Sequence, residues 1–165
     1  MAQTTIKARQ IDITAGGNVT EKVLNTQCKC KAYLNSAQNN LTDATNVKVL
    51  LDTEIYDIGA DFDTANSRFT APVSGYYLVS GAVGFSGVIA DKTYQTLVYV
   101  NGIEVSYAMV HSSHTGSLRV QFSDIVYVSA GQYIELYARA NAGASTVDLI
   151  AALASTYLNI HLLSV

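Results

Sequence analysis

The sequence predicts an all-β fold, an antiparallel sandwich of about eight to ten strands preceded by a short N-terminal arm. Short β-type runs recur from residue 29 onwards, with turn signals between them. No long helical pattern interrupts these runs. The single proline, Pro72, lies in a corner between two runs, where its missing N–H costs no ladder hydrogen bond.

Residues 1–27 are polar and are interpreted as an arm separate from the domain formed by residues 28–165. One part of the arm, Ile6–Ile13, alternates as a strand does. It is either a disordered tail or an anchor that pairs with a neighbouring protein. The candidate anchor residues are Ile6, Ile11 and Ile13. The N-terminus has no apolar segment of the signal-peptide kind.

The strands follow in order along the domain. They are expected at residues 30–34, 47–51, 68–71, 76–85, 94–100, 103–110, 117–128, 133–140 and 157–163. Polar loops are expected at 35–46 and 111–116, and the long loop at 141–155 has room for one helical turn. Two packed sheets with Greek-key connections fit this count, and an up-and-down barrel is the alternative.

Three of these strands carry further information. The run at 94–100 is apolar on both faces, which predicts a strand covered on both sides. Asn101 and Gly102 follow it, and Asn-Gly between two β runs is a strong hairpin signal. The apolar phase of 117–128 changes near Ser123 and Asp124, which predicts a bulge there.

The composition favours an assembled protein. Only 14% of the 165 residues are charged, against about 25% in ordinary soluble domains. We expect part of the surface to be covered by copies of the chain or by a partner, although a low-charge monomer would also fit. The net charge of −3 without a basic run argues against nucleic-acid binding. No apolar run is long enough to span a membrane.

Cys28 and Cys30 would point to the same face of a strand. A disulfide between residues i and i+2 strains extended backbone, and a metal site needs more ligands than this pair offers. We interpret them as reduced strand residues, with an inter-chain disulfide or a metal site as alternatives.

The sequence contains few of the residue patterns that catalysis requires. His111 and His114 flank a polar loop without a carboxylate or cysteine between them, and His161 alternates with apolar residues on a strand. No nucleophile-elbow, phosphate-loop or zinc-protease motif occurs. We therefore expect no enzyme and no cofactor. Five acids between residues 52 and 63 are read as solvated, with Ca²⁺ as the alternative: Asp52, Glu54, Asp57, Asp61 and Asp63.

Tyrosine is unusually frequent, with eleven copies against four Phe and no Trp. Tyrosine suits surfaces that are half apolar and half wet, and it is enriched at interfaces. Tyr133, Tyr137 and Tyr157 are the candidate subunit contacts. A tyrosine-rich exterior is the alternative.

A spaced pattern spans residues 51–79. Its members are Leu51, Asp57, Phe62, Phe69, Gly75, Tyr77 and Val79. The pattern resembles that of the complement C1q globular-head family, whose jelly roll is shared with the tumour necrosis factor superfamily. Leu51 and Val79 depart from it, since the family has an aromatic residue and Phe there. The segments at 99–102, 128–136 and 158–163 are similar to later family segments.

The resemblance implies a jelly roll that forms a tight homotrimer and acts as a binding head. The short polar arm looks like that of forms found in bacteriophage particles. We therefore expect a non-enzymatic virion component, assembled in the host cytoplasm as capsid decoration, head fibre or fibre tip. Its arm would attach it to a capsid or fibre protein. The alternative is a receptor- or carbohydrate-binding head that contacts host-surface glycans.

Overall fold

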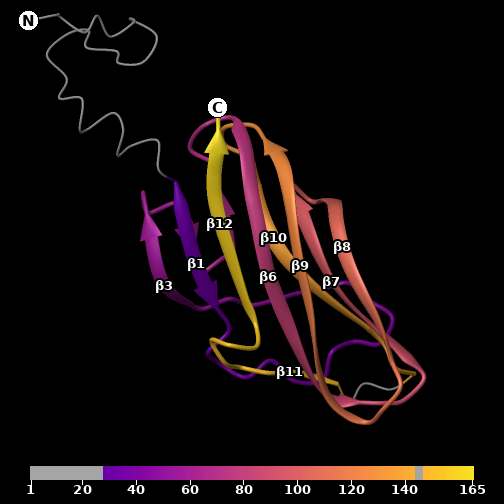
Figure 1. The fold of residues 1–165 in the computed structure, drawn as a ribbon. Coiled ribbons are helices and arrows are strands. Elements are labelled where there is room, and N and C mark those ends of the chain that lie inside the picture. Colours follow the sequence, from indigo (N-terminus) through magenta and orange to yellow (C-terminus); the bar gives the residue numbers. More distant parts are fainter. Residues whose placement is uncertain (1–27, 144–146) are drawn as a thin grey trace, which may run out of the picture.

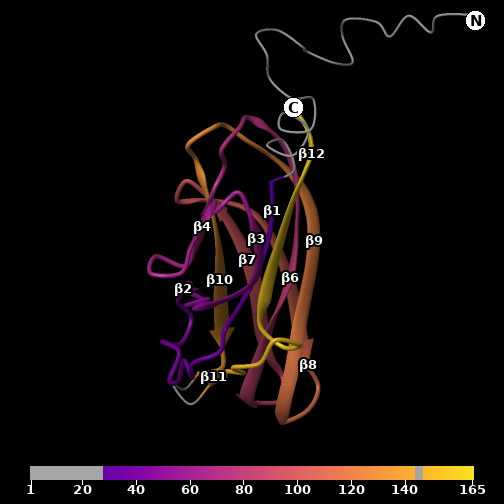
Figure 2. The same ribbon diagram turned by 90° about the vertical axis from the view of Figure 1, so that its left-hand side faces the viewer.

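The computed structural model describes residues 28–143 and 147–165, which form two antiparallel sheets packed face to face (Figures 1 and 2). No helix occurs in this part of the chain, and so none that could span a membrane. The prediction of an all-β antiparallel sandwich is confirmed. The arm and its candidate anchor residues Ile6, Ile11 and Ile13 lie outside the described residues.

Sheet A holds the longest strands. Its spatial order is β3 (Thr53–Ile58), β1 (Lys29–Tyr33), β12 (Tyr157–Ser164), β6 (Gly75–Val88) and β9 (Gly116–Val128). The short strand β11 (Asp148–Leu149) also pairs with the end of β6.

Sheet B covers the other side of the core. Its order is β4 (Phe62–Asp63), β5 (Arg68–Thr70), β10 (Tyr133–Asn141), β7 (Lys92–Val100) and β8 (Ile103–Ser112). The short strand β2 (Val47–Lys48) also pairs with β10.

The connections have jelly-roll character. Among the strands of residues 28–143 and 147–165, consecutive ones pair only at β4–β5 and β7–β8, and most connections cross from one sheet to the other. An up-and-down barrel would pair nearly all consecutive strands, so that alternative is wrong. Asn101 and Gly102 join β7 to β8, and both have positive φ angles (50° and 80°), as a tight hairpin turn requires.

The core lies between the sheets and is built from alternate side chains of each strand. On β6, Tyr77, Val79, Val83 and Phe85 are fully buried. The spaced pattern from the sequence supplies much of this core: Leu51, Phe62, Phe69, Tyr77 and Val79 are all buried. The rings of Phe69 and Tyr77 meet edge to face with their centroids 5.9 Å apart.

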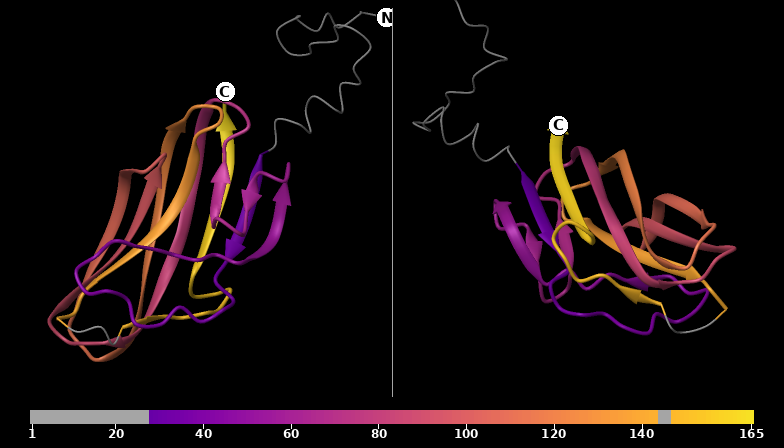
Figure 3. Two further views of the ribbon diagram at one scale, coloured as in Figure 1. Left: turned by 180° about the vertical axis from the view of Figure 1, so that it is seen from behind. Right: turned by 60° about the horizontal axis from the view of Figure 1, so that its bottom comes forward.

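The acidic segment differs from the expectation. Residues 53–58 and 62–63 form β3 and β4, where the sequence was read as a loop of solvated acids. The burial along β3 does not alternate, because it is an edge strand whose pairing with β1 contains a bulge between Lys31 and Ala32. Figure 3 shows β3 at the outer edge of sheet A.

Strand β9 also differs from the expectation. Its pairing with β6 is continuous from Tyr127 to Ser117, so the predicted bulge near Ser123 and Asp124 is wrong. Leu118, Val120 and Phe122 continue in phase to Val126 and Val128 on the core side. The apparent change of phase arose because the outward-facing Ile125 and Tyr127 are apolar as well.

Candidate functional site

The outward face of sheet A carries an exposed apolar surface. We call sheet A face the side chains of β1, β6, β9 and β12 that point away from the core. At its upper end Tyr76, Ile125, Tyr127 and Leu163 are each about half exposed. The rings of Tyr76 and Tyr127 meet edge to face at a centroid distance of 5.3 Å. Large exposed apolar patches mark interaction sites.

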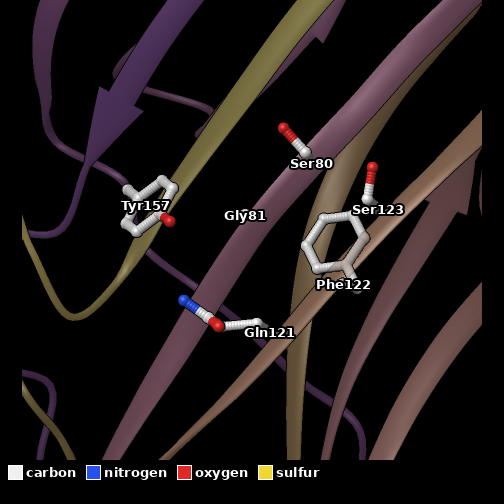
Figure 4. Close-up of a pocket in the computed structure, with 6 residues that line it drawn as sticks. All are labelled: Ser80, Gly81, Gln121, Phe122, Ser123 and Tyr157. Atoms are coloured by element: carbon white, nitrogen blue, oxygen red, sulfur yellow. The ribbon is translucent and has the colours of Figure 1, made fainter.

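A shallow pocket of about 350 Å³ lies in the same face, between β6, β9 and β12 (Figure 4). Its floor is at Gly81, where a Cβ would collide with the carbonyl oxygen of Tyr157. The ring of Tyr157 lies to one side of Gly81, whereas the side chain of Phe122 packs against the core. The remaining lining side chains are uncharged and polar: Ser80, Gln121 and Ser123.

The Lys and Arg side chains on the sheet A face give it charge of one sign. Lys29 and Lys31 project from β1 and Arg119 from β9. The Nζ of Lys31 lies 4.8 Å from the centroid of the Tyr157 ring. This face can therefore offer aromatic, apolar and cationic contacts.

The three candidate contact tyrosines do not come together. Tyr157 belongs to the sheet A face, whereas Tyr133 and Tyr137 lie on the outward side of sheet B. There Tyr137 stacks on Tyr99 at a centroid distance of 4.2 Å, and the guanidinium of Arg68 lies 5.0 Å from the Tyr133 ring. Both tyrosines are thus half-buried by their own chain.

The outward side of sheet B also holds a buried ion pair. Glu135 is 6% exposed and accepts a hydrogen bond from Lys48 Nζ at 2.5 Å. Burial, and next the neighbouring Glu135, raise the pKa of Tyr137. Sequence reasoning missed this pair because the strand pattern places Glu135 on a solvent-facing side.

The acidic residues mostly hydrogen-bond to loop backbone. Asp52 accepts from the N–H groups of Asn35 and Ser36 at 2.8 and 2.9 Å, and Asp57 accepts from that of Phe62 at 2.8 Å. Among the described residues no three His, Cys, Asp or Glu side chains gather as a metal site would need.

Asp61 has a buried carboxylate oxygen, Oδ2, without a hydrogen-bond partner in the described structure. Burial, and next the charge of Asp57, raise the pKa of Asp61.

The two cysteines lie in the core, on the same side of β1, and are free thiols. Burial, followed by the charge of Asp57, raises the pKa of Cys30 strongly; burial likewise raises that of Cys28. Tyr77 lies beside Cys28 and donates its hydroxyl to the carbonyl oxygen of Val73 at 2.6 Å. Burial raises the pKa of Tyr77 to about 12.

The histidines are dispersed. His111 Nε2 lies 4.0 Å from Asp91 Oδ1, with both side chains largely exposed, and His114 Nε2 lies 3.2 Å from the carbonyl oxygen of Ser117. Within the described residues no hydrogen bond links a Ser or Cys side chain to an imidazole, as nucleophilic catalysis would need. The geometry that is present supports binding.

No model of a known protein family matches the sequence, and no curated protein does. Solved structures do match the fold. The crystal structure of murine APRIL at pH 5.0 is similar over 83% of this chain and 99% of its own, with a TM-score of 0.63 and 14% identity. Eiger TNF from S. frugiperda matches over 84% of this chain and 93% of its own, with a TM-score of 0.64 and 10% identity.

The globular domain of zebrafish complement 1qA protein matches over 83% of this chain and 97% of its own. Its TM-score is 0.58 and its identity 14%. The domain is therefore a jelly roll of the type shared by C1q and tumour necrosis factor proteins, and the resemblance read from the sequence is confirmed at the level of the fold.

Proposed function

We propose that this chain is a non-enzymatic structural and binding module that assembles as a homotrimer. The observation that carries the proposal is the sheet A face, where Tyr76, Ile125, Tyr127 and Leu163 expose apolar surface side by side. Because only 14% of the residues are charged, the rest of the surface contributes little to the solubility of a chain that exposes such an apolar patch.

A closed ring needs two different surfaces that meet, because each subunit contacts its two neighbours differently. The second surface is the edge formed by β8 and β9, which lie beside each other in Figure 2. Ile103 and Val105 on β8 are 69% and 44% exposed. Packing this edge on a neighbour would cover both apolar surfaces and the open strand edges.

The charges of the two surfaces complement each other. The edge carries exposed Glu104 on β8 and exposed Asp124 on β9. The sheet A face carries only cations, among them Lys29 and Lys31. Complementary charge favours contact between edge and face and disfavours contact of two faces.

Light scattering tests the assembly. We expect a mass near three times the 17.7 kDa of one chain. A clean monomer at micromolar concentration would remove the basis of the proposal.

The finer part of the proposal is a place on a bacteriophage-like virion, as capsid decoration, head fibre or fibre tip. The chain would assemble in the host cytoplasm and attach to a capsid or fibre protein through the polar segment 1–27. This part is supported by the sequence resemblance alone. Deleting residues 1–27 should leave a folded trimer that no longer binds particles, and retained binding would show that the arm is not the attachment.

A receptor- or carbohydrate-binding head is the second candidate, and the pocket of Figure 4 favours it. An aromatic ring, that of Tyr157, beside uncharged polar side chains suits a neutral sugar. Glycan-array binding that is lost in Tyr157→Ala would support this candidate. No binding by the folded wild-type chain would argue against it.

A further inference from the structure

Strand β3 is an edge strand with an uncovered apolar surface. Within the described residues it pairs only with β1, and its other side is open in the views of Figures 1 and 3. Ile55, Tyr56 and Ile58 are 48%, 41% and 44% exposed. Proteins normally cover or charge such an edge, because its free N–H and C=O groups are a template for another strand.

The same edge lacks a donor for a carboxylate oxygen. Asp57 Oδ2 accepts from the N–H of Phe62, whereas Asp57 Oδ1 is buried without a partner in the described structure. Glu54, on the same strand, is exposed. The edge is therefore apolar and acidic, and it suits a strand that brings apolar and cationic side chains together.

The chain itself contains such a segment, N-terminal to a residue that pairs at this edge. Lys29, the first residue of β1, lies opposite Ile58, so residues 1–27 join the domain beside the end of β3. Ile6–Ile13 reads IKARQIDI, in which apolar residues alternate with Lys7 and Arg9. Residues 14–27, which include Gly16 and Gly17, can reach about 45 Å when extended, more than twice the roughly 20 Å of a six-residue strand.

We propose that Ile6–Ile13 of the same chain adds to the free edge of β3 as an antiparallel strand, with Ile6 opposite Ile58, Lys7 opposite Asp57 and Ala8 opposite Tyr56. All other pairs in sheet A are antiparallel, which favours the same direction here. This inference is independent of the trimer and of attachment to a particle, since the strand would form on a single chain.

The register follows from the side chains on each face. It places Ile6 and Ala8 beside Ile58 and Tyr56, which both face outwards. It places Lys7 beside the unpartnered oxygen of Asp57 and directs Arg9 towards Glu54, beyond the bulge. A slip of one residue would reverse every one of these contacts.

Disulfide trapping tests the register directly. Ala8→Cys and Tyr56→Cys are combined in the full chain, and the control combines Ile13→Cys with Tyr56→Cys on the same tether. Directly opposed residues have Cα atoms about 4.5–5.5 Å apart, which a disulfide can bridge. Under mild oxidation we expect the first pair to close within one chain at least ten times faster than the control, as read by peptide mass spectrometry.

Two results would overturn the proposal. Equal rates for the two pairs would show only the random encounters of a flexible tether. A bond found solely between chains would assign the edge to a second copy. The native Cys28 and Cys30 are buried and do not compete.

A charge-reversal series gives a second readout. Arg9→Glu should slow the trapping by at least threefold and speed amide hydrogen exchange at Ile55–Ile58. Adding Glu54→Lys should restore both, because the two charges are then exchanged and attract each other again. Exchange at these amides that is unchanged by deletion of residues 1–13 would count against the strand, whatever becomes of particle binding.

Discussion

Lys48 and Glu135 form an ion pair with a distance of 2.5 Å between Nζ and Oε1, although 87 residues separate them in the sequence. The pair joins the short strand β2 to the first part of β10. The Glu135 side chain is 8% exposed and that of Lys48 is 27% exposed. A carboxylate this buried depends on its partner.

Removal of one partner should therefore be costly. We expect Lys48→Met to lower the free energy of unfolding by about 3 kcal/mol, because it leaves a buried carboxylate unpaired. The double variant Lys48→Met with Glu135→Leu should recover most of this loss. Urea unfolding at a fixed protein concentration measures both, and a double variant as unstable as the single one would contradict the argument.

Gly75 should not tolerate a side chain, for a reason different from the one its turn-like sequence context indicates. Its φ angle is not positive; instead, a Cβ would collide with the carbonyl oxygen of Ser164 on β12. We expect Gly75→Ala to destabilise the domain by about 2–3 kcal/mol through backbone displacement. Ser80→Ala on the same strand is the control, with a change within about 0.5 kcal/mol. Equal small effects in thermal unfolding would refute the close-approach explanation.

Elements with regular alternation could be predicted from the sequence. The strands carrying Tyr77 and Ile134 bury alternate side chains over most of their length, so a period of two identifies them. The hairpin turn at Asn101 and Gly102 could also be predicted, because its signal lies in two adjacent residues. The spaced pattern between residues 51 and 79 also identified core positions. Its members are buried except Asp57, whose carboxylate accepts a hydrogen bond from the backbone N–H of Phe62.

The candidate site could not be predicted in the same way. Ile125 and Tyr127 looked like a slipped core phase because a sequence cannot tell an apolar interface from an apolar interior. Tyr133 and Tyr157 were grouped although they lie on different sheets, since sheet membership depends on the connections. Strand β3 escaped detection because exposure on both faces and a bulge remove the alternation.

The assembly can be tested by one charge on the sheet A face. Ile125 is 55% exposed there, and Leu50, in the loop before β3, is 52% exposed. We expect Ile125→Lys to lower the mass by light scattering towards that of one chain, since it buries a further cation in a contact surface that already carries Lys29, Lys31 and Arg119. Leu50→Lys should leave the mass unchanged. Equal masses for the two variants and wild type would exclude this face as the contact.

The two thiols should be unreactive in the folded protein. Cys28 and Cys30 are 3% and 0% exposed, and burial raises the pKa of each, so little thiolate is present at pH 8. We expect alkylation by iodoacetamide to be at least a hundredfold slower in native buffer than in urea. Rapid native alkylation of both thiols would show that this end of the core opens readily.

Asp61 should make the domain less stable as the pH rises through the acidic range. Burial and the charge of Asp57 raise the pKa of Asp61 in the folded state above its unfolded value of 3.8. Between these two pKa values the folded state binds more protons than the unfolded state, so stability from this group is present at low pH and is lost as the pH increases. Asp61→Asn removes the charge and leaves the backbone carbonyl of residue 61, which accepts from the N–H of Thr70, in place. We expect the variant to be more stable than wild type at pH 7 and the difference to vanish below about pH 3.8, as measured by urea unfolding across the range. A variant that is less stable at pH 7, or a difference that does not change with pH, would show that the carboxylate of Asp61 is stabilised by a donor in the folded protein.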